Sequence, residues 1–140
     1  MIEETTKQEL LKKQKVFARL NHQEIEILAT LFREQDIKSG TTIVTEGEHV
    51  DSVYLILEGK ADVRHVTLKD GQLNIQSLTT VGQGGSIGLS ETGFYSLTGL
   101  RTATVVALTD MVVLRLSIAA FNGFALAYPH VKEMVSQKQT

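Results

Sequence analysis

The residues best suited to chemistry lie in the segment 81–106, VGQGGSIGLSETGFYSLTGLRTATVV. Gly82, Gly84 and Gly85 are closely spaced there, and Arg101 follows them. Closely spaced glycines let backbone N–H groups approach a bound anion, and a concave row of such groups forms a nest for phosphate. An arginine facing the nest would donate charge-assisted hydrogen bonds to phosphate oxygens. The segment therefore suggests a phosphate site, although a plain turn before a strand explains the same glycines.

The composition limits what the rest of the chain can be. Its 140 residues are expected to form one domain, 1–140, with a substantial core. The net charge of −2 argues against a nucleic-acid footprint, which needs a concentrated basic face. The absence of cysteine excludes disulfides and thiolate chemistry, and no apolar run approaches the ~18 residues of a membrane span. We therefore expect a cytoplasmic domain with no membrane span and no direct contact with nucleic acid.

Two helices are expected near the N-terminus. Thr6 and Glu9 have the spacing of a capping box, which predicts a helix over about 7–15. Asn21 and Glu24 repeat that signature more strongly. The apolar residues that follow at positions i, i+3, i+4 and i+7 are Ile25, Leu28, Ala29 and Phe32. This spacing predicts a second helix that lies with one face on the core.

The middle of the chain reads as short strands separated by turns. The predicted strands are residues 41–45, 53–57, 61–65, 102–108 and 111–116. The continuous apolar run 53–57 is typical of a strand covered on both faces. Asp70-Gly71, between apolar residues on both sides, is the best hairpin signal. Many short strands without βαβ alternation predict a mainly β, α+β protein built on an antiparallel barrel or jelly roll.

Helices are expected again after the last strand. Ser117 is a plausible N-cap for a helix that carries Phe121, Phe124 and Ala125. Pro129, the only proline, fits the first turn of a last helix. The apolar face of that last helix would consist of Val131, Met134 and Val135.

Several ordered blocks together resemble the cyclic nucleotide-binding domain family, which includes the bacterial catabolite activator and the regulatory subunits of cAMP-dependent protein kinase. GTTIVTEGE at 40–48 resembles the family's G-x-x-I-x-x-E-G-[DE], and DSVYLILEG at 51–59 resembles its next strand and turn. VGQGGSIGL at 81–89 lies over the L-G-x-G-x-x-F-G-E of the phosphate-binding cassette, and RTATV at 101–105 lies over R-[AST]-A-T-V. The resemblance implies an antiparallel β-roll over about 33–116 with helices before and after it.

The resemblance also implies a ligand site. Its members in this sequence would be Gly88, Leu89, Ser90, Glu91, Arg101, Thr102 and Ala103. Arg101 would hold the cyclic phosphate, and the backbone N–H groups of Thr102 and Ala103 would also reach the ligand. Gly88 would let the cassette helix begin tightly against the phosphate. Gly47 and Gly59, by contrast, are interpreted as turn glycines that shape the roll.

One position departs from the family pattern. Leu89 stands where the family has a glutamate that accepts a hydrogen bond from the ribose 2′-OH. A hydrogen bond to a charged group is worth roughly 1.5–3 kcal/mol, so its loss predicts about ten- to a hundredfold weaker binding. Glu91 lies two positions later and could either replace that carboxylate or pair with Arg101 and close the pocket. The sequence leaves both arrangements open.

Other classes of function find less support. The four histidines, His22, His49, His65 and His130, are scattered and form no H-x-H or H-x-x-x-H pair, so no metal centre is expected. No nucleophile–base arrangement has supporting context, so we expect no enzyme and no cofactor. A transcription factor would need a dimerising helix and a helix-turn-helix that do not fit before Thr140.

The sequence therefore predicts a regulatory, ligand-sensing domain that binds a cyclic nucleotide, cAMP or cGMP, weakly. The alternative is a degenerate fold of the same type that acts as a protein-interaction module without binding a nucleotide. Either function implies an output domain or a partner protein, and the oligomeric state stays open.

Overall fold

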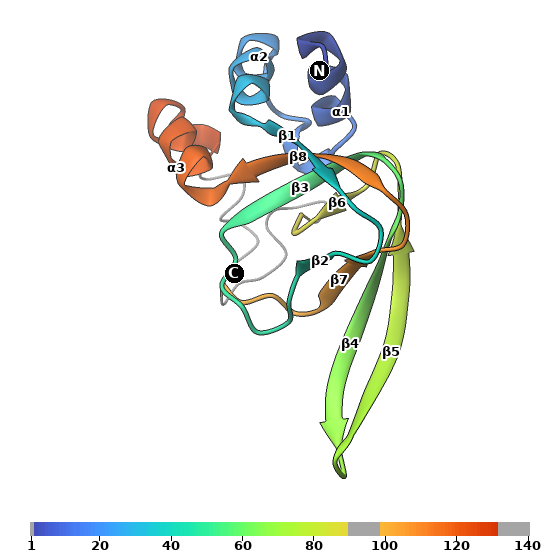
Figure 1. Ribbon diagram of the computed structural model, residues 1–140. Coiled ribbons are helices and arrows are strands. Elements are labelled where there is room, and N and C mark those ends of the chain that lie inside the picture. Colours follow the sequence, from blue (N-terminus) through green and yellow to red (C-terminus); the bar gives the residue numbers. More distant parts are fainter. Residues whose placement is uncertain (1, 90–98, 132–140) are drawn as a thin grey trace.

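The computed structural model describes residues 2–89 and 99–131. Ser90 and Glu91 lie outside the described residues, as do Met134 and Val135 of the expected last helix. Along the chain, the described parts contain two N-terminal α-helices, then eight strands, then one C-terminal α-helix (Figure 1). In chain order the elements are α1 (Glu4–Lys12), a 3-10 helix η1 (Lys15–Phe17), α2 (His22–Leu31), β1 (Arg33–Ile37), β2 (Thr42–Val44), β3 (Ser52–Glu58), β4 (Ala61–Lys69), β5 (Gln72–Val81), β6 (Ser86–Ile87), β7 (Thr104–Ala107), β8 (Met111–Ser117) and α3 (Ile118–Ala127).

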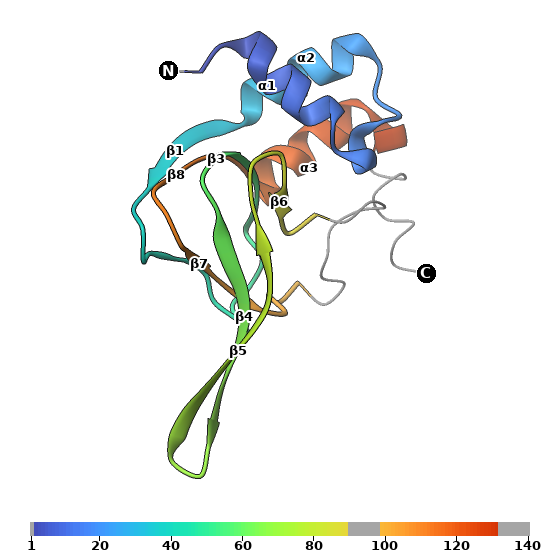
Figure 2. The same cartoon turned by 90° about the vertical axis from the view of Figure 1, so that its right-hand side faces the viewer.

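The strands form two four-stranded antiparallel sheets. One has the order β1-β8-β3-β6, and the other has the order β2-β7-β4-β5. The three helices gather at the end of the roll that carries the first sheet (Figures 1 and 2). This arrangement confirms the predicted β-roll with flanking helices. Strand β1 was not among the predicted strands, because its sequence, REQDI, lacks an apolar alternation. In the structure, four of its five residues are exposed.

Strand β3 explains how the two layers are held together. Val53 and Leu55 belong to the buried cluster that the helices share with the first sheet. Tyr54 and Ile56 point the other way, into the cluster between the two sheets. Because side chains alternate across a strand, the continuous apolar run buries both faces, as predicted.

The second helix has the predicted capping box. Asn21 Oδ1 accepts a hydrogen bond from the Glu24 N–H at 2.8 Å, and Glu24 Oε1 accepts one from the Asn21 N–H at 3.0 Å. The apolar stripe of this helix, Ile25, Leu28, Ala29 and Phe32, is buried. Helix α2 is therefore fixed by local chemistry and by the core.

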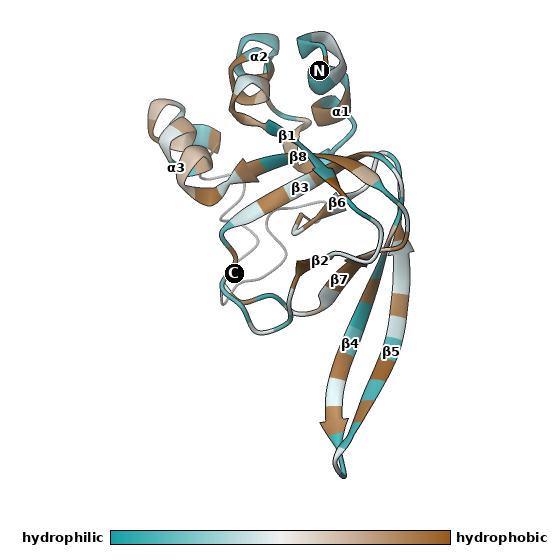
Figure 3. Ribbon diagram, viewed as in Figure 1, coloured by the Kyte–Doolittle hydropathy of each residue, from teal (hydrophilic) through white to brown (hydrophobic). Residues whose placement is uncertain are grey.

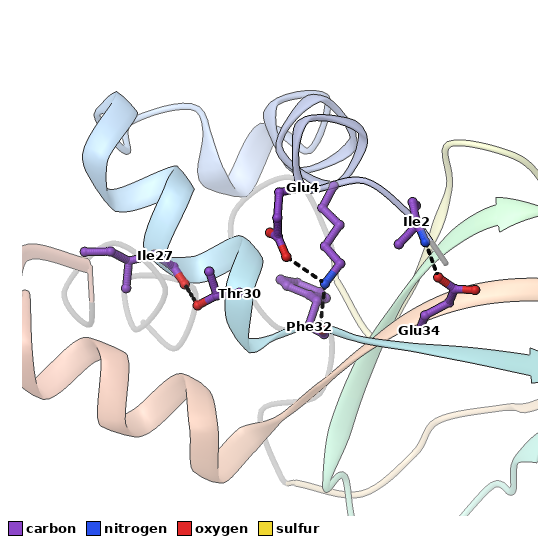
Figure 4. A network of polar contacts seen from close by, with 7 residues as sticks. Ile2, Glu4, Ile27, Thr30, Phe32 and Glu34 are labelled. Atoms are coloured by element: carbon purple, nitrogen blue, oxygen red, sulfur yellow. Dashed lines mark hydrogen bonds and ion pairs between the residues drawn. The ribbon is translucent and has the colours of Figure 1, made fainter.

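The capping box predicted at Thr6 and Glu9 is wrong. Helix α1 begins earlier, at Glu4, and ends at Lys12. The Thr6 N–H already donates to the Glu3 carbonyl at 3.1 Å, so Thr6 lies within the first helical turn and is not its cap. Contacts from Lys7 anchor this helix instead: its Nζ donates to Glu4 Oε1 at 3.3 Å and to the carbonyl of Phe32, the C-cap of α2, at 3.2 Å (Figure 4).

The predicted hairpin is present and projects from the body of the roll (Figures 1 and 2). Asp70 and Gly71 have φ angles of 53° and 78°, which is the pair of positive values that a type I′ turn needs. Strands β4 and β5 run further than the flanking apolar residues indicated, over nine and ten residues.

Helix α3 begins where the sequence indicated. Ser117 Oγ accepts a hydrogen bond from the Ala120 N–H at 3.0 Å, and Phe121, Phe124 and Ala125 are buried. Residues 129–131 are helical, which agrees with the placement of Pro129 in a first turn. None of the described helices is long and apolar enough to cross a membrane.

Candidate functional site

The glycine-rich segment before the site is a turn and not a phosphate nest. The Gly84 N–H donates to the Ile56 carbonyl at 2.9 Å, and the Gly85 N–H donates to the Gly82 carbonyl at 2.9 Å. Both groups are therefore already bound within the protein and do not point at an anion. These glycines form the turn between β5 and β6, which agrees with the simpler of the two sequence interpretations, a plain turn before a strand.

Gly88 makes the close approach that the site requires. Its φ is +92°, and a Cβ built on it would lie 3.2 Å from Arg101 Nη1 and 3.1 Å from Val53 Cγ1. A larger residue would push the guanidinium away and would also be strained at that φ angle. Gly88 thus lets the backbone after β6 lie directly against the arginine.

Arg101 is fixed by its backbone and by its side chain. Its carbonyl accepts from the Gly47 N–H at 2.9 Å, and its N–H donates to the Glu48 carbonyl at 2.8 Å. In the side chain, which is only 6% exposed, Nη2 donates to the Ser52 carbonyl at 2.7 Å and lies 3.9 Å from Asp51 Oδ1. The turn before β7 therefore delivers a cation into the interior of the roll.

Burial is the main influence on this cation. It lowers the pKa of Arg101 below its ordinary value, although the nearby Tyr54, Asp51 and Glu48 act in the opposite direction. The pKa of a free guanidinium is so high that the group keeps its proton at neutral pH all the same. A buried permanent cation is costly unless anionic or polar groups surround it.

Arg101 faces a cavity of about 410 Å³ inside the roll. Its wall combines the segment after β6, the turn before β7, and the parts of β4 and β5 that lie away from the hairpin turn. The lining residues are Val44, Val50, Val63, His65, Leu78, Thr79, Val81, Ser86, Ile87, Gly88, Leu89, Arg101, Thr102, Ala103 and Val105. One buried cation in a mostly apolar wall suits a ligand that has an anionic group and an apolar or flat remainder.

The cavity brings together five of the seven residues implied by the resemblance. Gly88 and Leu89 belong to the segment after β6, and Arg101, Thr102 and Ala103 belong to the segment before β7. Ser90 and Glu91 lie outside the described residues. Segments that are twelve or more positions apart in sequence therefore meet at one wall.

Leu89 has two surroundings at once. It lines the cavity, and it is also a member of the buried cluster that includes Phe121 and Phe124 of α3. Its exposed fraction is 7%. Leu89 is thus an apolar link between the cavity and the C-terminal helix.

Sequence reasoning missed the opposite wall of the cavity. Val63 and His65 come from β4, and Leu78 and Thr79 come from β5. His65 Nδ1 also lies 3.1 Å from Glu46 Oε1. The alternation of Val63 and His65 was a usable signal that both side chains share one face, but only the curvature of the sheet shows that this face lines a cavity.

The histidines do not gather. His22 lies near Glu26, His65 near Glu46 and His130 near Glu24. Among the residues that the structure describes, no three metal-binding side chains are placed to share an ion.

Comparison with known proteins agrees with this geometry. The sequence model of the cyclic nucleotide-binding domain matches residues 34–128, more than half of the chain. The chain belongs to this family. The cyclic nucleotide-binding domain is a regulatory, ligand-sensing fold, and the matched range includes all the residues that line the cavity at Arg101.

Individual relatives place the domain in larger proteins. Lysophospholipase NTE1 of Yarrowia lipolytica is 29% identical over 119 residues, which is 72% of this chain but 8% of that protein. The cAMP-bound protein PfPKA-R has a similar fold, with a TM-score of 0.74 at 24% identity, covering 87% of this chain and 41% of that one. The regulatory subunit of a cAMP-independent protein kinase A from Trypanosoma brucei has a TM-score of 0.69 at 25% identity, covering 96% and 47%. The chain thus spans less than a tenth of the length of the lysophospholipase.

Proposed function

We propose that the cavity binds a cyclic nucleotide, cAMP or cGMP, with the cyclic phosphate against the Arg101 guanidinium. The observation that carries this proposal is a buried cation on the wall of an otherwise largely apolar cavity of about 410 Å³. In a low-dielectric site the attraction between this cation and a phosphate is much stronger than it is in water. A nucleotide would also offer an apolar, flat base to the remaining wall.

The surroundings of the guanidinium support the phosphate role. Gly88 has no side chain, so the backbone there lies directly against the Arg101 guanidinium and helps to hold it at the cavity wall. The guanidinium can donate to the phosphate while Nη2 keeps its bond to the Ser52 carbonyl, because it has five N–H donors. Thr102 and Ala103 line the cavity next to it, where their backbone groups would complete the contact.

Leu89 supports weak binding. Its side chain is a hydrocarbon, so it offers no acceptor to a ribose hydroxyl, and it packs among apolar groups. The missing hydrogen bond to a carboxylate is worth roughly 1.5–3 kcal/mol, or about ten- to a hundredfold in affinity. We therefore expect a dissociation constant well above that of a family member with the glutamate.

Leu89 also suggests how binding would be communicated. It belongs to one buried cluster with Phe121 and Phe124 of α3 and with Val131 after it. A ligand that moves the segment at Gly88 and Leu89 would repack this cluster and shift the position of the C-terminal helix. The shift is limited by the ligand's differential affinity for the two arrangements, so a weak ligand makes a weak switch.

The second candidate is an interaction module that binds no nucleotide, and the apolar side chain of Leu89 favours it. Proteins of similar fold differ in their relation to cAMP: PfPKA-R was solved with cAMP bound, and the Trypanosoma brucei subunit belongs to a cAMP-independent protein kinase A. In this candidate the Arg101 contact to Ser52 would be purely structural.

Isothermal titration calorimetry with cAMP and with cGMP distinguishes the two candidates. We expect micromolar or weaker binding that is lost in Arg101→Ala. Arg115→Gln is the matched control, because Arg115 also lies near Asp51, at 3.6 Å, but does not line the cavity. Circular dichroism should show that all variants are folded. No heat from either nucleotide up to millimolar concentration would overturn the proposal in favour of the interaction module.

A further inference from the structure

The β4–β5 hairpin carries an apolar face that nothing in the described chain covers. Val66 lies opposite Ile75, and Leu68 lies opposite Leu73, so all four side chains point to one side of the ribbon. Leu68 and Leu73 are each 71% exposed, Ile75 is 56% exposed and Val66 is 37% exposed. Figure 3 shows the corresponding apolar bands along both strands.

The other side of the same ribbon is polar. His65 lies opposite Gln76, Thr67 opposite Asn74, and Lys69 opposite Gln72. Single exposed apolar residues are ordinary, but four in two directly opposed pairs form a contiguous patch. In the outer part of the hairpin, residues 65–76, this division into a polar and an apolar side is the pattern of a sheet that rests on another surface.

The position of β5 adds an edge that only one bulge, at 77–79, interrupts. It is the end strand of its sheet, and its ten residues, QLNIQSLTTV, include no charge, proline or glycine. Natural proteins usually protect such an edge with lysine, proline, a bulge or a covering element. A two-stranded ribbon that stands away from the roll also gains little stability by itself. Both features call for a partner surface on this hairpin.

We propose that the apolar face of this hairpin, Val66, Leu68, Leu73 and Ile75, is a self-association surface on which a second copy of this chain docks through the same face. Such a contact is isologous, with one patch on both copies, which is the commonest arrangement of homodimers. The hairpin projects from the roll, so two copies can meet there with their bodies apart (Figures 1 and 2).

The charges of the hairpin favour a second copy over a membrane. Residues 61–81 carry two acidic and two basic side chains, Asp62, Arg64, Lys69 and Asp70, so their charges balance. Asp62 and Arg64 lie on the same side of the ribbon as Val66, nearer the roll, and they pair with each other at 2.8 Å. Two hairpins whose charges balance do not repel each other through a net charge. Binding to an anionic membrane surface relies on an excess of lysine and arginine, which is absent here.

The size of the face sets the expected strength. A stable interface buries about 800 Å² on each partner, and four side chains with their neighbours on one ribbon supply less. The self-association is therefore weak and depends on concentration. We expect a monomer in dilute solution and a dimer when the chain is concentrated or tethered within a larger assembly.

The first test is sedimentation velocity of the full 140-residue chain over a wide range of concentration. The double variant Leu68→Lys/Leu73→Lys places charges in the apolar face and is expected to weaken dimerisation at least about tenfold. Thr67→Lys/Asn74→Lys adds the same charge on the polar face and should leave it unchanged. Circular dichroism and thermal unfolding check that both variants keep the fold.

A second test leaves the apolar face nearly intact. Because the chain has no cysteine, Leu73→Cys provides a single thiol in the face, and Asn74→Cys provides one on the opposite side. Mild oxidation should cross-link Leu73→Cys into dimers much faster than Asn74→Cys. The proposal is overturned by a monomer at all concentrations, by equal cross-linking of the two variants, or by co-sedimentation of the monomer with phosphatidylcholine–phosphatidylserine vesicles that Leu68→Lys/Leu73→Lys abolishes.

Discussion

Strands β3 and β5 lie in the same roll and meet opposite surroundings. In β3, Val53, Leu55 and Ile56 are completely buried. In β5, nine of ten residues are exposed, and Leu73 and Ile75 are among them. Both strands contain the residue types that favour β structure.

The contrast arises from the neighbours and not from the strands themselves. Strand β3 has β8 and β6 beside it, a helical layer on one face and the second sheet on the other. Among the described elements, strand β5 has one neighbour, β4, and no layer lies over its outer half. Strand β3 thus contributes its apolar side chains to the core, whereas β5 leaves apolar side chains exposed on the surface.

The largest expected effect is a loss of stability in β3 that has no counterpart in β5. Leu55→Ala removes a fully buried side chain and should lower the free energy of unfolding by about 2–5 kcal/mol. Leu73→Ala removes the same atoms from a side chain that is 71% exposed and should stay within about 0.5 kcal/mol. Urea unfolding at low protein concentration measures both. Similar losses at the two positions would contradict the contrast drawn between the strands.

The next effect is a loss of stability that tests whether the close contact at Gly88 is as constrained as the core around β3. Gly88→Ala and Gly47→Ala both replace a glycine at positive φ, which costs about 1–2 kcal/mol in each case. A Cβ at Gly88 also meets Arg101 and Val53, which adds about 1–3 kcal/mol, whereas Gly47 has open space around it. Thermal unfolding compares the two variants. If Gly47→Ala were the more harmful, the close approach at Gly88 would not be a constraint.

A smaller effect concerns the helices that cover β3. Asn21→Ala removes the observed cap of α2 and should cost about 1 kcal/mol. Thr6→Ala removes a hydroxyl that is not the cap of α1 and should cost much less, since alanine is a better helix former within a turn. Chemical denaturation of both variants is the measurement. An equal loss at Thr6 would restore the capping box that the structure contradicts.

The smallest effect is a dependence on pH at the helical layer. Burial opposes the ionisation of Glu24, but hydrogen bonds from His130 and from the Asn21 N–H, together with the charge of His130, hold its pKa below the ordinary value of 4.5. A lowered pKa in the folded state stabilises the protein above the unfolded-state pKa, and this contribution is lost as the pH falls through the folded-state pKa.

Urea unfolding over a series of acidic pH values checks that contribution. Glu24→Gln should flatten the loss of stability on acidification relative to the unchanged chain. Glu26→Gln removes an exposed carboxylate from the same helix and serves as the control. An unchanged slope in Glu24→Gln would show that this carboxylate does not contribute to acid sensitivity.

Much of the fold followed from local patterns in the sequence. The Asn21–Glu24 box, the Asp70-Gly71 turn and the run around Leu55 each encode their structure within a few residues, because caps, type I′ turns and doubly buried strands have short-range signatures. Strand β1 has no such signature, and only its pairing with β8 makes it a strand. The box at Thr6 failed for a related reason: its spacing was correct, but the helix began one turn earlier.

The candidate site divides in the same way. The sequence by itself predicted that Gly88 and Arg101 share a site, because the blocks 81–89 and 101–105 both resemble parts of one cassette, and the structure brings these two residues into contact. Tertiary structure alone decided that the Gly84 N–H donates to Ile56 of β3 and that Val63 and Leu78 complete the cavity wall. It also decided that Leu68 and Leu73 stay exposed. The reason is physical: burial and the availability of a donor depend on which distant segments fold over a residue, and no local pattern records them.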